Sequence, residues 1–322
     1  MTKGTKVTLA DKLAHAGTIE RRVAINRTTF FVKRSARLIA RLQLIVYCWR
    51  FAQRVDGRVV AIWPPLTEFY RRIDGAEYSP SLIFDLEVFY GGGGAESLVF
   101  LEGRIPTPKM SRSVRDREFA DQIPNTFDAE NFRRNALTFH ELLPITYSFK
   151  DEPKDIDYFR RSLRKTYEAL PHHPLIIHVL NDSRRRIAAE SYVGLHVRRG
   201  DIIDLLRNEL PRLEGGLVSE AQLASVLRAY LGRTTLYESY YGPVEDAIAE
   251  GRKVVFFSDS PETFDHFAAK FGGRHFVNAA RLVKPRHAIQ KAFVDFNLLV
   301  GASRIISTGG SIYASFAAML GG

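Results

Sequence analysis

The pattern of apolar and polar residues predicts that strands and helices alternate along most of the chain. Residues 28–32 are β-branched and aromatic, as in a strand, and residues 37–55 space apolar side chains three and four apart, as on one helical face. Gly57 predicts the end of that helix, and residues 58–63 predict a buried strand that ends at Pro64. A strand, a helix and a strand within about 35 residues are typical of a βαβ unit with parallel strands.

The same alternation returns after a less regular middle. That middle contains the run Tyr90–Gly94, which we expect to be a surface turn, and helices at residues 158–169 and 174–189. The strands expected beyond it are residues 192–197, 253–257, 275–277 and 304–307, and the helices are residues 219–231, 261–271, 288–302 and 312–320. The order predicts an α/β protein with a second doubly wound domain. We place the boundary so that the domains are residues 1–187 and residues 188–322.

Length and composition agree with two ordinary globular domains. The chain has 322 residues, of which 45% are hydrophobic and 25% charged, and these values exclude intrinsic disorder and a collagen-like protein. A single cysteine, Cys48, excludes an intramolecular disulfide and a cysteine-based zinc site, and the histidines lack ligand spacing. The most apolar early run, residues 42–49, is far short of the ~20 residues that span a bilayer. We therefore expect a cytoplasmic protein without a transmembrane segment; peripheral membrane contact stays open.

The charge balance favours an anionic partner. The chain has 46 basic and 36 acidic residues, a net charge of +10. Nucleic acid, a phosphorylated small molecule or an acidic membrane surface would each be served by this charge. Nucleic acid is disfavoured because the basic residues are spread along the chain and no stacking aromatic motif accompanies them.

Candidate chemistry begins at the end of the strand at residues 192–197. In open parallel sheets, ligands bind beyond the carboxyl ends of the strands. Alternation places His196 and Arg198 on the same side, and the planar guanidinium of Arg198 suits a phosphate or diphosphate oxygen. Gly200 permits a sharp turn, and Asp201 can brace the arginine. The alternative is that these arginines belong to a solvated basic turn or pair with an acid. We favour this alternative interpretation for Arg199.

A second strand end carries three polar residues: Ser258, Asp259 and Ser260. The carboxylate of Asp259 can accept hydrogen bonds from a purine edge or a ribose hydroxyl. Alternatively, Asp259 or Ser260 caps the helix that begins at Pro261. The two roles are compatible.

A third strand end carries a Ser/Gly run: Ser307, Thr308, Gly309, Gly310 and Ser311. Backbone N–H groups at a glycine loop and a helix N-terminus bind anions, although a glycine turn with a serine cap would have the same sequence. Together, an arginine, an acid and a Ser/Gly helix terminus at three ends of one sheet predict a nucleotide diphosphate pocket.

These motifs also resemble a known family. His-x-Arg-x-Gly-Asp after an apolar strand, a Ser-Asp-Ser strand end, and an Asp-x-x-x-Leu helix leading to Ser-Thr-Gly-Gly-Ser-x-Tyr are similar to the GDP-fucose-dependent fucosyltransferases. The stretches that carry the resemblance are residues 192–201, 253–261 and 295–318. The opening βαβ unit is similar to that of the family as well.

The resemblance implies a GT-B-like fold, with two Rossmann-like domains that face each other across a cleft. The N-terminal domain would lie on the acceptor side and the C-terminal domain would bind the nucleotide-sugar donor. The family transfers fucose to a glycan acceptor with inversion and without a divalent metal, so no metal and no cofactor are expected. Arg198 would stabilise the leaving diphosphate, Asp259 would hold the base or ribose, and Ser307–Ser311 would cradle phosphate.

One stretch departs from the family pattern. The family has a glycine-rich turn after its first strand, whereas residues 33–40 here are Lys-Arg-Ser-Ala-Arg-Leu-Ile-Ala, without a glycine. Close approach of the backbone to a ligand is therefore lost. Two alternatives to a fucosyltransferase follow: a transferase that uses another nucleotide sugar, and a diverged GT-B protein that binds nucleotide or glycan without turnover.

Overall fold

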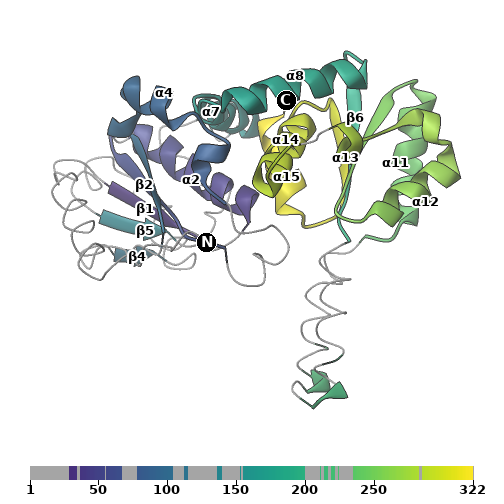
Figure 1. Ribbon diagram of the computed structural model, residues 1–322, viewed down its shortest axis with the longest axis horizontal. Coiled ribbons are helices and arrows are strands. Elements are labelled where there is room, and N and C mark those ends of the chain that lie inside the picture. The colour runs from purple at the N-terminus through teal and green to yellow at the C-terminus, as the bar shows by residue number, and fades with distance from the viewer. Residues whose placement is uncertain are drawn as a thin grey trace, which may run out of the picture. The chain divides into compact units, whose positions relative to one another are not determined.

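The structure is a computed structural model of the chain (Figure 1). It describes residues 29–34, 37–54, 56–66, 78–103, 112–114, 136–139, 153, 155–199, 211, 214–216, 219–221, 224, 235–282 and 285–321. The chain divides into two units, Met1–His173 and Pro174–Gly322. The sequence-based boundary between residues 187 and 188 assigns the helix at residues 174–187 to the first domain, whereas this division assigns it to the second unit.

The first unit is built on a parallel sheet. Its strands are β1 (Thr29–Lys33), β2 (Arg58–Trp63), β3 (Leu98–Glu102), β4 (Arg112–Val114) and β5 (Ala136–Phe139), in the order β3-β2-β1-β5-β4. Every pairing is parallel, and the register between the first two strands runs from Thr29 opposite Arg58 to Lys33 opposite Ile62. The predicted βαβ unit is confirmed.

Helix α2 (Leu38–Arg54) forms the core of this unit. Fourteen of its 17 residues are buried, because it packs against both β1 and β2 and against helix α7 (Ile156–Glu168). Buried arginines on α2 find aromatic and polar partners. The guanidinium of Arg50 lies 4.8 Å from the ring centroid of Phe159 and donates to Ser162 Oγ.

Arg41 is enclosed more completely. Its guanidinium lies 5.0 Å from the ring centroid of Trp63 and 5.3 Å from that of Tyr78, and it donates to the carbonyl of Pro64 at 2.7 Å. Burial lowers the pKa of Arg41 to about 10, so the group stays cationic at neutral pH.

The predicted surface turn at Tyr90–Gly94 is more ordered than expected. Helix α4 (Leu86–Gly91) takes up its first two residues, and two 3₁₀ turns, η1 (Pro80–Leu82) and η2 (Gly94–Glu96), lie on either side of that helix. The helix forms because the carboxylate of Asp85 caps it by accepting from the amide of Val88. Gly93 then reverses the chain with a φ of +85°, a value that favours glycine.

The second unit is built on four parallel strands. These are β6 (Tyr192–Val197), β7 (Lys253–Ser258), β8 (Phe276–Asn278) and β9 (Arg304–Ser307), in the order β8-β7-β6-β9. The helices are α8 (Pro174–Ile187), α11 (Glu238–Ala249), α12 (Pro261–Phe271), α13 (Ala279–Leu282), α14 (Ala288–Val300) and α15 (Ile312–Leu320), with the 3₁₀ turn η3 (Gly273–His275). The predicted doubly wound α/β sheet is confirmed.

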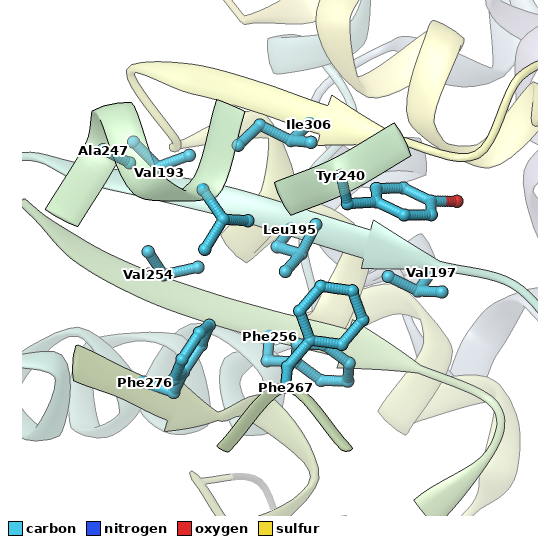
Figure 2. Packing of buried hydrophobic residues seen from close by; sticks show 11 residues of the cluster. Val193, Leu195, Val197, Tyr240, Ala247, Val254, Phe256, Phe267, Phe276 and Ile306 are labelled. Atoms are coloured by element: carbon cyan, nitrogen blue, oxygen red, sulfur yellow. The ribbon is translucent and has the colours of Figure 1, made fainter. Parts of the chain in front are cut away.

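Alternation along β6 gives the two faces of this sheet different partners. Val193, Leu195 and Val197 point into an apolar cluster with α11 and α12 (Figure 2). On the opposite face, an added Cβ at Gly194 would lie 2.5 Å from Leu299 Cδ1, so the glycine allows α14 to pack directly on the strand. All six β6 residues are consequently buried.

Some elements differ from the sequence-based expectation. Strands β3, β4 and β5 were not predicted, and neither was α11, whose Gly242 and Pro243 read as helix breakers. Burial of Tyr240, Val244 and Ala247 on one face of α11 outweighs the weak local propensity. The predicted helix at residues 219–231 lies almost wholly outside the described residues. Across the described ranges, every helix is too short or too polar to cross a membrane.

Candidate functional site

The sheet order of the second unit indicates where a ligand would bind. In the order β8-β7-β6-β9, the chain starts at β6, builds outward through β7 and β8, and then returns to the other side of β6. At such a reversal, open α/β sheets bind ligands beyond the carboxyl ends of the two strands between which the order reverses, here β6 and β9. Those ends are followed by Arg198 after β6 and by Thr308 after β9.

Thr308 joins the two strand ends. Its amide donates to the carbonyl of His196 at 3.0 Å, and its Oγ1 accepts from the amide of Arg198 at 2.9 Å. The same Oγ1 lies 2.8 Å from the hydroxyl of Tyr240 on α11. Because Thr308 is 2% exposed, these bonds are shielded from water and fix where the backbone of Arg198 leaves the sheet.

Arg199 is fixed by a different set of contacts. Its amide donates to Asp259 Oδ1 at 2.7 Å, which ties the end of β6 to the end of β7. Its guanidinium lies 3.7 Å from the ring centroid of Tyr237, and Nη2 donates to the carbonyl of Thr235 at 3.4 Å. Its Nε is buried and has no hydrogen-bond partner in the described part of the chain. The Arg199 side chain is thus held in place by its neighbours and is not that of a solvated turn residue. Its Nε–H group can still donate a hydrogen bond to a ligand.

The two serines that flank Asp259 are engaged locally. Ser258 Oγ accepts from the amide of Ser260, and Ser260 Oγ donates to Glu262 Oε2 at 2.7 Å. Ser260 occupies the N-cap position of α12, as the capping alternative expects, although its hydroxyl does not bond a helix amide. The carboxylate of Asp259 connects this strand end to Arg199, just beyond the end of β6.

The Ser/Gly run after β9 turns the chain into α15. Gly310 has a φ of +68°, where a side chain would be strained, and Ser311 Oγ caps the helix by accepting from the amide of Ala314. The amide of Gly309 donates to Thr235 Oγ1 at 3.0 Å. The amides of Gly310 and Ile312 have no partner among the described residues, so they are the donors that this turn can offer to an anion.

His196 is buried against Tyr313 of α15. Its ring stacks on Tyr313 with centroids 5.1 Å apart and planes at 11°. Burial lowers the pKa of His196 to about 4, with Asp259 opposing the shift and Arg198 adding to it. The imidazole is therefore neutral at physiological pH and adds no charge next to the strand ends.

Asp295 is a polar group that the sequence analysis used only as part of a motif. It lies on α14, one turn after Ala292, whose carbonyl accepts from the hydroxyl of Tyr313. Burial raises the pKa of Asp295 to about 7, with Lys291 opposing the shift, and its Oδ1 has no partner in the described ranges. Asp295 is therefore a buried carboxyl group with one oxygen that can still accept a hydrogen bond.

Three contributing residues on or next to α11 were missed from the sequence: Thr235, Tyr237 and Tyr240. The available signal was the run Tyr237, Tyr240 and Tyr241, which has the i, i+3, i+4 spacing of one helical face. Two predicted site residues, Gly200 and Asp201, lie outside the described residues.

Metal-ligating groups do not gather in the described part of the chain. No three His, Cys, Asp or Glu side chains come together there in a way that could hold a metal ion. The sequence Asp155-Ile156-Asp157 has the spacing of a metal-binding Asp-x-Asp motif. Its first carboxylate caps α7 by accepting from the amides of Asp157 and Tyr158.

Comparison with known proteins finds likeness in structure alone. No protein family and no curated protein matches the sequence. The crystal structure of the fucosyltransferase NodZ from Bradyrhizobium aligns over 92% of this chain and 93% of its own, with a TM-score of 0.50 and 13% identity. The crystal structure of NodZ alpha-1,6-fucosyltransferase co-crystallized with GDP gives the same score and identity over 92% of both chains. The likeness confirms the predicted α/β fold of the GT-B type.

Proposed function

We propose that the protein is an inverting glycosyltransferase that transfers fucose from GDP-fucose to a glycan acceptor. The second unit binds the donor and the first unit binds the acceptor. The observation that carries the proposal is the pair of consecutive arginines after β6, with Arg198 anchored by Thr308 and Arg199 by Asp259 and Tyr237. Fold likeness to a fucosyltransferase co-crystallized with GDP supports a guanine nucleotide as the leaving group.

The arginines would act on the charge that develops during transfer. An acceptor hydroxyl attacks the anomeric carbon of fucose from the face opposite the phosphate and gives up its proton to water, the bond from that carbon to the β-phosphate oxygen breaks, and configuration inverts. Negative charge grows on the departing diphosphate as the bond lengthens. Arg198 and Arg199 stabilise that charge through N–H···O⁻ bonds, and because their backbones are already fixed, little reorganisation is needed.

The amides of Gly310 and Ile312 would add donors from the N-terminus of α15, whose dipole also favours the diphosphate. Asp259 would accept from the ribose or the base with the carboxylate oxygen that does not bond Arg199. Because the arginines supply positive charge at the leaving group, we propose that transfer needs no divalent metal.

The first experiment is thermal stabilisation of the whole protein by GDP, GDP-fucose, GDP-mannose, UDP-glucose and ADP, with EDTA present. A ligand at 100 times its Kd adds about 2.7 kcal/mol, which shifts the Tm by about 5–10 °C for a unit of this size. We expect guanine nucleotides alone to produce the shift. Equal shifts with UDP-glucose or ADP would exclude guanine specificity, and no shift with any nucleotide would overturn the proposal.

Arg198→Ala tests the role of the first arginine. We expect this variant to lose GDP-fucose turnover while its Tm without ligand stays within a few degrees of the wild type. Arg274→Ala is the matched control, because Arg274 is an exposed arginine that precedes β8, away from the carboxyl ends of the strands, and its side chain bonds His275. Unchanged turnover in Arg198→Ala would contradict the mechanism.

A second candidate function is nucleotide binding without turnover. It is favoured by the chain between β1 and α2, where Lys33, Arg34 and Arg37 stand in a segment without glycine. The two candidates differ in one measurement. A transferase releases GDP from GDP-fucose in the presence of a glycan acceptor, whereas a binding protein is stabilised by GDP-fucose and releases none.

A further inference from the structure

A stack of three aromatic side chains with a cationic side chain at each end begins at Arg199. The guanidinium of Arg199 covers one face of the Tyr237 ring, and the other face stacks on His266 with centroids 4.3 Å apart and planes at 22°. Tyr241 extends the stack at the edge of His266: its ring centroid lies 6.1 Å from that of His266 with the planes at 19°, and its hydroxyl bonds His266 Nε2 at 2.7 Å. Lys270 Nζ ends the stack 4.2 Å from the ring centroid of Tyr241.

The stack connects three elements. Arg199 follows β6, Tyr237 is the N-cap residue of α11 and Tyr241 lies in its first turn, and His266 and Lys270 lie one turn apart on α12. Tyr237 is fixed at both ends, since its hydroxyl lies 3.1 Å from Thr263 Oγ1 and its ring meets Phe267 edge-on at 5.5 Å. Thr263 and Phe267 are fully buried. The ring under Arg199 is therefore anchored in the core of the second unit.

This arrangement restricts the guanidinium. A cation over a ring face is held by the ring quadrupole, and the guanidinium plane stacks well on an aromatic face. The backbone amide of Arg199 is held by Asp259 Oδ1, and Nη2 at the tip of the side chain is held by the carbonyl of Thr235. Both the base and the tip of the side chain are therefore fixed. The buried Nε, unfilled among the described residues, then has a defined direction. An arginine ordered before its ligand arrives loses less side-chain entropy on binding.

We propose that Tyr237 is a positioning residue for Arg199, supported from behind by His266, and that this stack sets the affinity of the second unit for the diphosphate group of a nucleotide. The inference rests on the proposed function, because it takes Arg199 as a diphosphate ligand. It goes further by assigning that affinity to residues of α11 and α12 that touch no substrate.

The test compares Tyr237→Leu with Tyr237→Phe in the full chain. The ligands are GDP, inorganic pyrophosphate and guanosine, and the readout is the dissociation constant of each by calorimetry. Tyr237→Leu removes the ring, and we expect binding of GDP and pyrophosphate to weaken about tenfold, or about 1.4 kcal/mol. Tyr237→Phe keeps the ring and loses only the contact with Thr263, so both affinities should stay within about twofold of the wild type.

Binding of guanosine distinguishes a loss of Arg199 positioning from general damage to the nucleotide site. Guanosine has no phosphate, so its affinity should be the same in the wild type and in Tyr237→Leu. Tyr158→Leu, a change of the same size on helix α7 of the first unit, is the matched control and should leave all three affinities unchanged. If Tyr237→Leu does not fold, His266→Ala replaces it. Loss of that exposed ring should weaken pyrophosphate about threefold.

The outcomes distinguish the positioning role of Tyr237 from the proposed function. Wild-type binding of GDP together with unchanged GDP and pyrophosphate affinity in Tyr237→Leu would overturn the positioning role and leave the proposed function standing. Equal weakening of guanosine would also overturn it, because the ring would then be a general structural element. A wild-type protein that binds none of the three ligands would overturn the proposed function, and this inference with it.

Discussion

Thr308→Val tests whether one hydroxyl holds the strand ends of the second unit together. Valine has nearly the shape of threonine, so the substitution removes the bonds of Oγ1 to the amide of Arg198 and to the hydroxyl of Tyr240 with little change in packing. Each polar group left without a partner in a buried site costs about 1–3 kcal/mol. With two groups affected, we expect the free energy of unfolding to fall by about 2–6 kcal/mol.

Urea unfolding measures the loss, and two further variants identify its cause. Thr308→Ser keeps the hydroxyl and should lose only about 1 kcal/mol for the missing methyl group. In the double variant Thr308→Val/Tyr240→Phe the tyrosine no longer has an unsatisfied hydroxyl, so the double loss should be about 1 kcal/mol smaller than the sum of the single losses. Strict additivity, or a Thr308→Val variant as stable as the wild type, would refute the reasoning.

Two other substitutions follow from the surroundings of α14. Burial raises the pKa of Asp295 to about 7, so its protonated form favours the folded state, and the stability that it contributes is full below about pH 4 and lost as the pH rises through 7. Asp295→Asn should therefore match the wild type at pH 4 and exceed it by about 2–4 kcal/mol at pH 8, and a stability difference independent of pH would contradict this. Gly194→Ala places a Cβ 2.5 Å from Leu299 Cδ1 and 3.2 Å from Ala302 Cβ. Overpacking should lower the unfolding free energy by about 1–3 kcal/mol in a urea titration, and unchanged stability would show that α14 can move away freely.

The sequence alone predicts the parts of this fold in which local pattern and tertiary packing agree. The strand at residues 192–197 has the predicted bounds, because an apolar run buried on both faces of a parallel sheet is visible in composition. Helix α11 was missed because Gly242 and Pro243 suggest a break, and only burial against the sheet outweighs it. Strand β3 is short and follows a glycine-rich turn, so its pattern predicts little without its partner β2.

The candidate site was predicted as a set of strand ends but not as a set of contacts. Arg198, Asp259 and Thr308 could be selected because each follows an apolar strand. That Thr308 bonds the amide of Arg198, 110 residues away, depends on strand order, which residue spacing does not contain. The sequence around Arg199 suggested a solvated basic turn. The ring that orders its guanidinium is that of Tyr237, at the start of α11, a helix that the sequence pattern did not predict.

The strand order has a consequence for how the second unit is made. On the ribosome, β6 is synthesised first and pairs with β7 soon after, but its other edge stays open until β9 follows β8. Contacts this far apart in sequence form slowly, and an exposed strand edge invites association with other chains in the meantime. The arginine pair thus acquires its final geometry only when the last strand closes the sheet. During synthesis, nucleotide binding would report completed folding of this unit, and a chaperone that covers the edge of β6 would raise the yield.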